Sequence, residues 1–233
     1  PITNDSYEGT AEFTIASSQN GNIVLVLRES ENPCLCNNTY TKIDIPDRFT
    51  CDDTLFLTHN DENTASAPGF YTIRNSSNPL IYDERNENIN DVFINAIGFD
   101  PTDNYVFGVD SANRNLVIID SNYDIFKYRT IAGLPSATPG SPYTAGEFDL
   151  AGNFYVATQK ATELYVIEID TRTSTTVVLS ESVTIGDFAF NPIDGLLYFV
   201  DIDSQELKNI NPTNGNVSTI GALTIPLGEV GAM

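Results

Sequence analysis

The sequence contains the same twelve-residue pattern twice, and this repetition constrains the fold more than any other feature. Residues 190–201 read FNPIDGLLYFVD, and residues 99–110 read FDPTDNYVFGVD. A third copy, AGEFDLAGNFYVA, occupies residues 145–157. The copies are spaced by 49 and 42 residues, measured between the aligned Phe99, Phe148 and Phe190. A self-similar unit of about 40–50 residues indicates a repeat architecture.

Each copy predicts four short β-strands joined by tight turns. The first strand is expected at residues 95–100, 145–150 and 186–191. An aromatic second strand follows a turn rich in Asn, Asp and Gly, which tolerate the left-handed backbone of hairpins. A third strand is expected at residues 115–120, 163–170 and 206–212, and a fourth strand closes each unit. Four strands per repeat of this length are typical of a β-propeller blade. We therefore predict an all-β fold, a β-propeller of four-stranded blades.

About three and a half blades are visible, over residues 50–233. An earlier partial copy supplies a second, third and fourth strand in DTLFLTHND, GFYTIRN and NPLIYDE. A last copy begins at Leu227 and stops within a first strand at Met233. The alternative is a repetitive β-sandwich, which also has short strands at regular spacing. It would not repeat a four-strand unit with the same turn in the same place.

Residues 1–49 are predicted to form a separate N-terminal β segment. The stretch 11–28, AEFTIASSQNGNIVLVLR, has two apolar runs around Gln-Asn-Gly-Asn, which indicates a hairpin. The run from Ile23 to Leu27 is typical of a strand buried on both faces. This segment is open to three interpretations: it completes the last blade, forms its own β-domain, or adds to the sheet of a neighbouring subunit.

The repeat resembles the blades of bacterial extracellular β-propellers, the broad group of NHL-like, YVTN-like and uncharacterised propeller domains of large secreted surface proteins. The pattern F-[DN]-P-x-D-[GN]-x-[LV]-[YF]-x-V-D carries the resemblance, and it covers about residues 50–233. FTCDDTLFLT, residues 49–58, also looks like the start of such a domain. The resemblance implies hairpins and a core, and an extracellular or cell-surface location. It implies no chemistry, because propellers have many unrelated functions.

Three cysteines, Cys34, Cys36 and Cys51, cluster in one short region. A disulfide from Cys34 or Cys36 to Cys51 would close a loop of about sixteen residues and needs an oxidising compartment. It leaves one cysteine to cross-link subunits or to pair elsewhere. Three reduced thiols, or a zinc site completed by His59, are the alternatives. The first residues, PITNDSYEG, lack a signal-peptide pattern, which favours a mature product or an excised piece.

The chain is strongly acidic, with a formal net charge of -21. This charge repels nucleic acids and anionic lipids, and no apolar run is long enough to span a membrane. Calcium is a candidate ligand of paired carboxylates, although most such residues are expected to cap turns. The residues concerned are Asp61 with Glu62, and Asp201 with Asp203. Loops after the second strands are expected to share one face with the loops between blades. Asp110, Glu163 and Tyr143 would lie on this binding face.

The residues favour a protein without enzymatic activity. A hydrolytic triad needs a histidine base, and His59, in a polar stretch, is the only histidine. We therefore expect an extracellular structural or adhesive module of a surface protein or surface filament, with a protein partner or self-assembly. The alternatives are a metal-dependent lactonase-like or lyase-like propeller enzyme, and a carbohydrate-binding module that exposes Tyr143 to a glycan. No cofactor is expected beyond the candidate calcium.

Overall fold

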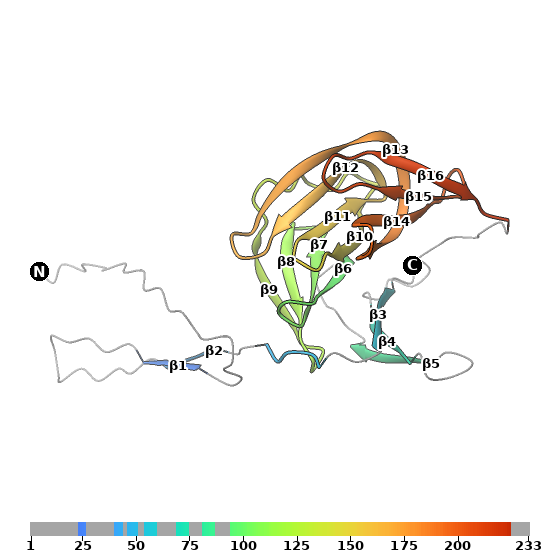
Figure 1. The fold of residues 1–233 in the computed structure, drawn as a ribbon. Helices are drawn as coiled ribbons and strands as arrows, with labels where there is room; N and C mark the ends of the chain where they lie inside the picture. Colours follow the sequence, from blue (N-terminus) through green and yellow to red (C-terminus); the bar gives the residue numbers. More distant parts are fainter. Residues whose placement is uncertain are drawn as a thin grey trace, which may run out of the picture. The chain divides into compact units, whose positions relative to one another are not determined.

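All regular structure in the described part of the chain is β-strand (Figure 1). The computed structural model describes residues 23–26, 40–43, 46–50, 54–59, 69–74, 81–86 and 94–224. Within these residues no helix has the length and apolar character needed to cross a membrane. The prediction of an all-β fold is confirmed.

The chain divides into two compact units, Pro1–Asp47 and Arg48–Met233. In the first unit, β1 (Ile23–Val26) pairs antiparallel with β2 (Tyr40–Ile43). The strand expected at Ile23–Leu27 is therefore present. Its partner in the described residues follows it in the chain, whereas the hairpin pattern pointed to a partner before it. The apolar run before Gln19 lies outside the described residues.

The second unit begins with two separate sheets. The first is a three-stranded sheet of order β3-β4-β5, formed by β3 (Thr54–His59), β4 (Gly69–Arg74) and β5 (Ile81–Asn86). The second is a four-stranded sheet of order β6-β7-β8-β9. Its strands are β6 (Ile94–Asp100), β7 (Tyr105–Asp110), β8 (Asn115–Ile119) and β9 (Ile125–Thr130).

Two further repeats share one long strand. The sheet has the order β10-β11-β12-β13-β14-β15-β16. Its strands are β10 (Tyr143–Phe148), β11 (Phe154–Thr158), β12 (Lys160–Glu168), β13 (Thr173–Asn191), β14 (Leu196–Asp201), β15 (Glu206–Ile210) and β16 (Val217–Ala222). The first part of β13 pairs with β12, and its last part, from Ile185, pairs with β14.

The length of β13 differs from the sequence prediction, which separated an outer strand from a first strand. The residues between them, Glu181-Ser182-Val183-Thr184, include no Gly or Pro to end a strand. Val183 and Thr184 instead continue the ladder by pairing with Ala161 and Lys160. One strand therefore carries the chain from one repeat to the next.

Each first strand ends in a turn that an Asp or Asn side chain holds. The Oδ1 atom of Asp100 accepts the backbone N–H of Thr102 at 2.8 Å, and Asp149 and Asn191 do the same for Ala151 and Ile193. The backbone then takes a positive φ at Asn104, Gly152 and Gly195. Asx turns of this kind explain the repeated Asp, Asn and Gly of the motif.

The first strands of successive repeats lie side by side and run in the same direction. A Cβ added to Gly146 of β10 would meet the backbone of Ile97 of β6 at 2.8 Å, and one added to Gly98 would meet Glu147 at 3.0 Å. Further along, the Thr144 hydroxyl donates to the carbonyl of Ile185 in β13 at 2.9 Å. The strands β6, β10 and β13 therefore form the centre around which the repeats are arranged.

Apolar side chains fill the spaces between neighbouring sheets. Phe107 packs on Phe148 at a ring distance of 5.5 Å, and Phe148 stacks on Phe154 at 4.5 Å. On the other face of the third repeat, the buried Leu164 and Phe199 belong to one cluster. Full burial of each such side chain contributes on the order of 1.5–3 kcal/mol. The repeats are held together by face-to-face packing.

Candidate functional site

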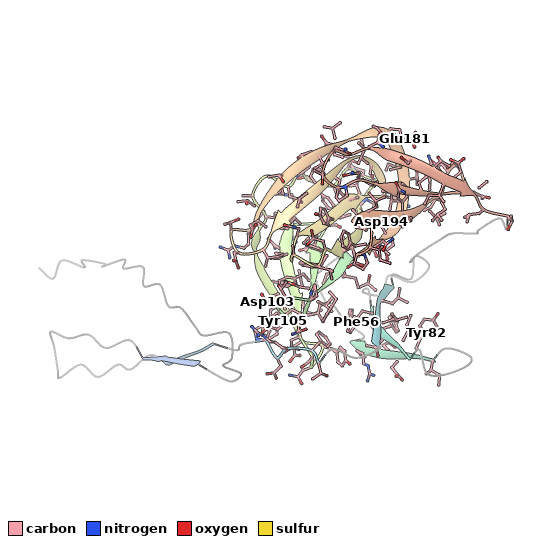
Figure 2. The ribbon with its side chains drawn as sticks, in the orientation of Figure 1. Phe56, Tyr82, Asp103, Tyr105, Glu181 and Asp194 are labelled. Atoms are coloured by element: carbon pink, nitrogen blue, oxygen red, sulfur yellow. The ribbon has the colours of Figure 1, made fainter. Side chains whose placement is uncertain are left out.

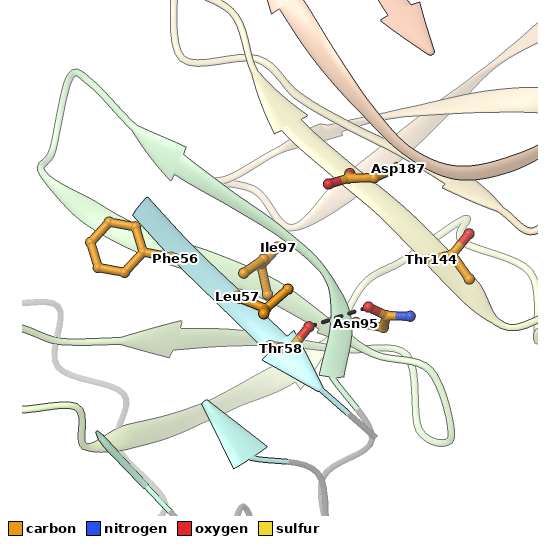
Figure 3. A pocket seen from close by; sticks show the side chains of 7 residues that line it. All are labelled: Phe56, Leu57, Thr58, Asn95, Ile97, Thr144 and Asp187. Atoms are coloured by element: carbon orange, nitrogen blue, oxygen red, sulfur yellow. Dashed lines mark hydrogen bonds between the residues drawn. The ribbon is translucent and has the colours of Figure 1, made fainter. Parts of the chain in front are cut away.

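A small pocket lies where the first strands converge (Figure 3). It has a cavity volume of about 20 Å³. Four segments of chain that are distant in sequence contribute its walls. The lining residues are Phe56, Leu57 and Thr58 of β3, Asn95 and Ile97 of β6, Thr144 of β10 and Asp187 of β13.

Three of its polar residues lie in β-bulges. The register shifts between Ile94 and Ile97 in β6, where Asn95 lies, and between Ile185 and Phe188 in β13, where Asp187 lies. A third shift, between Tyr143 and Ala145, places Thr144 in the same situation. A bulge turns a side chain away from the regular alternation of a strand. The same irregularity in three repeats therefore brings three polar side chains to one pocket.

Hydrogen bonds hold these polar groups in place. The Thr58 hydroxyl donates to Oδ1 of Asn95 at 3.2 Å, and this bond joins β3 to β6. Asp187 accepts the backbone N–H of Phe188 at 2.8 Å. The pocket thus offers hydroxyl, amide and carboxylate groups from four segments. Its volume suits one water molecule or one small ion, because a water needs about 10–15 Å³ of such space.

Glu147 is a second acidic residue of these central strands. Its Oε1 accepts the backbone N–H of Phe148 at 2.8 Å, as Asp187 does with Phe188. Burial raises the pKa of Glu147 to about 7, and the bond from Phe148 offsets part of this rise. The carboxyl group therefore changes its charge near neutral pH.

Asp201, a candidate calcium ligand, pairs with a lysine. Lys208 Nζ lies 2.9 Å from Asp201 Oδ2 and 2.8 Å from Glu181 Oε1. Burial is the largest single effect and raises the pKa of Asp201, but the hydrogen bonds from Lys208, Thr184 and Ser204 and the charge of Lys208 together outweigh it, so the net pKa is lowered. Burial lowers the pKa of Lys208. The hydrogen bonds to Glu181 and Asp201 and their charges together raise it by more, so the net pKa of Lys208 is raised. Asp203, the second candidate, is exposed and accepts the Thr184 hydroxyl at 2.6 Å.

The residues expected on the binding face have local structural partners. Asp110 is fully buried and accepts the backbone N–H of Ala112 at 3.1 Å. Glu163 accepts the hydroxyl of Tyr165 at 2.6 Å. Within the described residues, no three His, Cys, Asp or Glu side chains come together to hold a metal ion. The remaining candidates, Asp61, Glu62, Cys34, Cys36 and Cys51, lie outside the described residues, and His59 is described only as the last residue of β3.

The expectation that Tyr143 is exposed in a loop is wrong. Tyr143 is the first residue of β10 and is 0% exposed. Its hydroxyl donates to the carbonyl of Pro135 at 2.8 Å, and its ring packs edge-on against Tyr165. Burial raises the pKa of its phenol. The ring is part of the core between two sheets, so a glycan cannot stack on it.

Sequence reasoning missed the pocket residues Asn95, Thr144 and Asp187, and it also missed Glu147 of β10. For Asn95, Glu147 and Asp187 the signal was present in the aligned first strands NAIGFD, AGEFDL and GDFAFN, whereas Thr144 precedes the second of these stretches. A strand alternation assigns such residues to one face of the sheet. Only the bulges direct three of them to a common pocket.

The fold defines the class of protein as a β-propeller. A solved structure of a protein of unknown function from Bacteroides thetaiotaomicron has a TM-score of 0.53 and 15% identity, over 78% of this chain and 50% of that one. Virginiamycin B lyase from Staphylococcus aureus, solved with quinupristin, has a TM-score of 0.47 and 14% identity, over 75% and 62%. An auxiliary nutrient binding protein from Bacteroides thetaiotaomicron has a TM-score of 0.45 and 12% identity, over 76% and 42%. The chain spans about half of the length of the Bacteroides thetaiotaomicron protein of unknown function and about three fifths of the length of virginiamycin B lyase.

Residues 56–233 match the family model DUF6923, described as a repeat of unknown function. The chain therefore belongs to the DUF6923 family. The comparison with curated proteins gives no match. At the identities found, the likeness to solved structures concerns the fold alone.

Proposed function

We propose that this propeller is a non-enzymatic extracellular module that acts through protein contacts, as a structural or adhesive part of a surface protein or filament. The observation that carries the proposal is an apolar face on the first sheet. Leu55, Ile73 and Tyr82 are register partners across β3, β4 and β5, so they share one face. Leu55 is 53% exposed and Tyr82 is 58% exposed.

The opposite face of this sheet is apolar too, and it packs against the neighbouring sheet. It carries Phe56, which stacks near Phe70 and Phe99 at ring distances of 5.8 and 6.4 Å and so joins the first sheet to the second. Figure 2 shows Phe56 and Tyr82 on this sheet. An exposed apolar face on a repeat whose other face packs on a neighbouring sheet is suited to bind a further protein surface.

The central pocket supports the same proposal. A cavity of about 20 Å³ is far smaller than the 300–1,000 Å³ of a typical small-molecule site. The charge of -21 favours a neutral or basic partner surface over an acidic one.

The proposal is tested by assembly of the purified chain. Negative-stain electron microscopy and light scattering, with and without reductant, would compare the wild type with Leu55→Asn/Tyr82→Asn. We expect ordered filaments or rings in the wild type and single particles in the double variant. Ile193→Asn is the matched control, because Ile193 is 93% exposed in a turn. Monomeric wild type at high concentration would contradict self-assembly. An antibody against the chain, applied to intact cells, tests the location.

A further inference from the structure

The strand β16 is the last of the seven-stranded sheet, and its outer edge is open within the described part of the chain (Figure 1). β16 pairs with β15 from Val217 to Ala222, and among the described strands it has no neighbour on its other side. Val217 is half-buried, and the other five residues of β16 are exposed. The backbone N–H and C=O groups along such an edge can pair with another strand.

The outer strands of the first two sheets differ from β16 because they carry charges. β5 contains Asp83, Glu84 and Arg85, and β9 contains Lys127 and Arg129. Charged side chains on an edge strand oppose its pairing with another chain. β16 reads VSTIGA and has neither a charged residue nor a proline. Its edge therefore lacks the side chains that oppose pairing.

The first part of β13, residues 173–180, is also an outer strand without charge, but neighbouring repeats hold its edge at both ends. Ala132 forms a parallel bridge with Thr173, and its carbonyl accepts the backbone N–H of Ser174 at 2.8 Å. Near the other end, Ser180 donates its backbone N–H to the carbonyl of Gly215 at 2.9 Å. The edge of this part of β13 is thus partly occupied from within the chain.

The uncharged surface of β16 continues onto β13. A Cβ added to Gly215, in the turn before β16, would meet the carbonyl carbon of Val178 at 2.8 Å, so the two outer strands are in contact there. Val178 is 68% exposed and Ile220 of β16 is 50% exposed. Residues 173–180 read TSTTVVLS. Two neighbouring outer strands therefore lack charge in a chain whose formal net charge is -21.

This lack of charge favours a second copy of the chain as the occupant of the edge. Two copies that each carry a charge of -21 repel each other, so they approach best where neither surface is charged. Like charges opposite each other across two strands are destabilising, and β16 has none. A strand that pairs antiparallel with its own copy obeys two-fold symmetry, so the N–H groups of each edge meet the C=O groups of the other.

We propose that β16 pairs antiparallel with β16 of a second copy, which gives a two-fold dimer with one sheet continuous across both chains. Main-chain hydrogen bonds supply the affinity, as in other cases of strand addition, and the exposed Ile220 packs at the contact. The proposal does not depend on the proposed function, because the apolar face of Leu55 and Tyr82 belongs to the β3-β4-β5 sheet.

The test uses full-length Leu55→Asn/Tyr82→Asn under reducing conditions, so that neither that apolar face nor a disulfide contributes. Analytical ultracentrifugation should show a dimer that dissociates on dilution. Addition of NaCl should strengthen the dimer, because salt screens the repulsion between two acidic chains and this contact contains no ion pair to weaken. In hydrogen–deuterium exchange, β16 amides should exchange more slowly at high than at low protein concentration, with β8 as the internal reference.

Substitution of Ile220 tests whether β16 itself is the contact. In the same background, Ile220→Glu should weaken the dimer at least about tenfold, because the two-fold axis brings like charges together. Ile193→Glu is the matched control: it changes the charge equally at a residue that is 93% exposed in a turn, and the dimer should persist. An equimolar mixture of Ile220→Glu and Ile220→Lys should associate more tightly than either variant alone.

Three results would overturn the proposal. The first is a monomer at every concentration of the Leu55→Asn/Tyr82→Asn chain, which would mean that the edge of β16 binds no second copy. The second is a dimer that Ile220→Glu leaves intact, which would mean that another surface makes the contact. The third is exchange of β16 amides that is independent of concentration while a dimer forms. Filaments of the wild type would not rescue the proposal in any of these cases, since they test the apolar face instead.

Discussion

At the scale of single residues, several acidic side chains in the described part of the chain hold local structure in place. Asp100, Asp149 and Asn191 hold equivalent turns, and Asp201 is held by Lys208. Buried polar groups are costly unless they are hydrogen-bonded, so these contacts are what allows the residues to lie inside the fold. Glu147 differs from them because burial raises its pKa to about 7, and the one bond from the backbone of Phe148 offsets only part of this rise.

We predict that Glu147 makes the folded state less stable as the pH rises from about 4.5 to about 7. Its folded pKa of about 7 lies above the ordinary value of 4.5, so the folded state binds the extra proton in this window. Glu147→Gln should therefore match the wild type at pH 4 and be more stable by on the order of 2–3 kcal/mol at pH 8. Urea unfolding at several pH values measures the difference.

The exposed Glu168 supplies the control for that series. Glu168→Gln should follow the wild-type pH dependence, since its side chain is solvated in both states. A Glu147→Gln variant with the same pH dependence as the wild type would contradict the assignment of this slope to Glu147.

At the scale of strands, the central packing depends on the close approach of β6 and β10. A Cβ at Gly146 would lie 2.7 Å from the carbonyl carbon of Ala96 and 2.8 Å from the nitrogen of Ile97, both backbone atoms. Backbone cannot move aside as the end of a flexible side chain can. Gly146 is therefore a packing requirement of β10.

We predict that Gly146→Ala destabilises the fold by about 1–3 kcal/mol, because overpacking forces the two strands apart. Gly221→Ala is the control, since a Cβ there meets nothing within 4 Å. Thermal and urea unfolding measure both variants. Equal stability of Gly146→Ala and Gly221→Ala would mean that β6 and β10 are not packed this closely.

At the scale of the whole molecule, the formal charge of -21 opposes compactness by self-repulsion. We predict that the melting temperature rises between about 10 and 200 mM NaCl, because salt of this concentration reduces the screening length to about 10 Å or less. CaCl₂ at matched ionic strength distinguishes screening from binding. An equal rise indicates screening alone, whereas a larger rise with CaCl₂ supports the candidate ligands Asp61, Glu62 and Asp203. A melting temperature independent of NaCl would contradict the prediction.

The sequence by itself determined the repeat, the strands and their turns, because these depend on neighbouring residues. FDPTDN and FNPIDG contain the residues that close their own turns, and the alternation of apolar residues places the core faces. The prediction that Tyr143 lies in an exposed loop was wrong because the burial of its ring does not depend on its neighbours in sequence. It depends on contacts with Pro135 and Tyr165.

The tertiary structure alone decided which residues form the pocket and in which direction β3 runs relative to β6. Asn95, Thr144 and Asp187 meet because three bulges interrupt the period-two alternation in strands that lie side by side. The direction of β3 relative to β6 follows from contacts of Phe49 and Thr58 with residues far away in the chain. Local preference cannot encode such contacts, because their energy exists only once the sheets have packed.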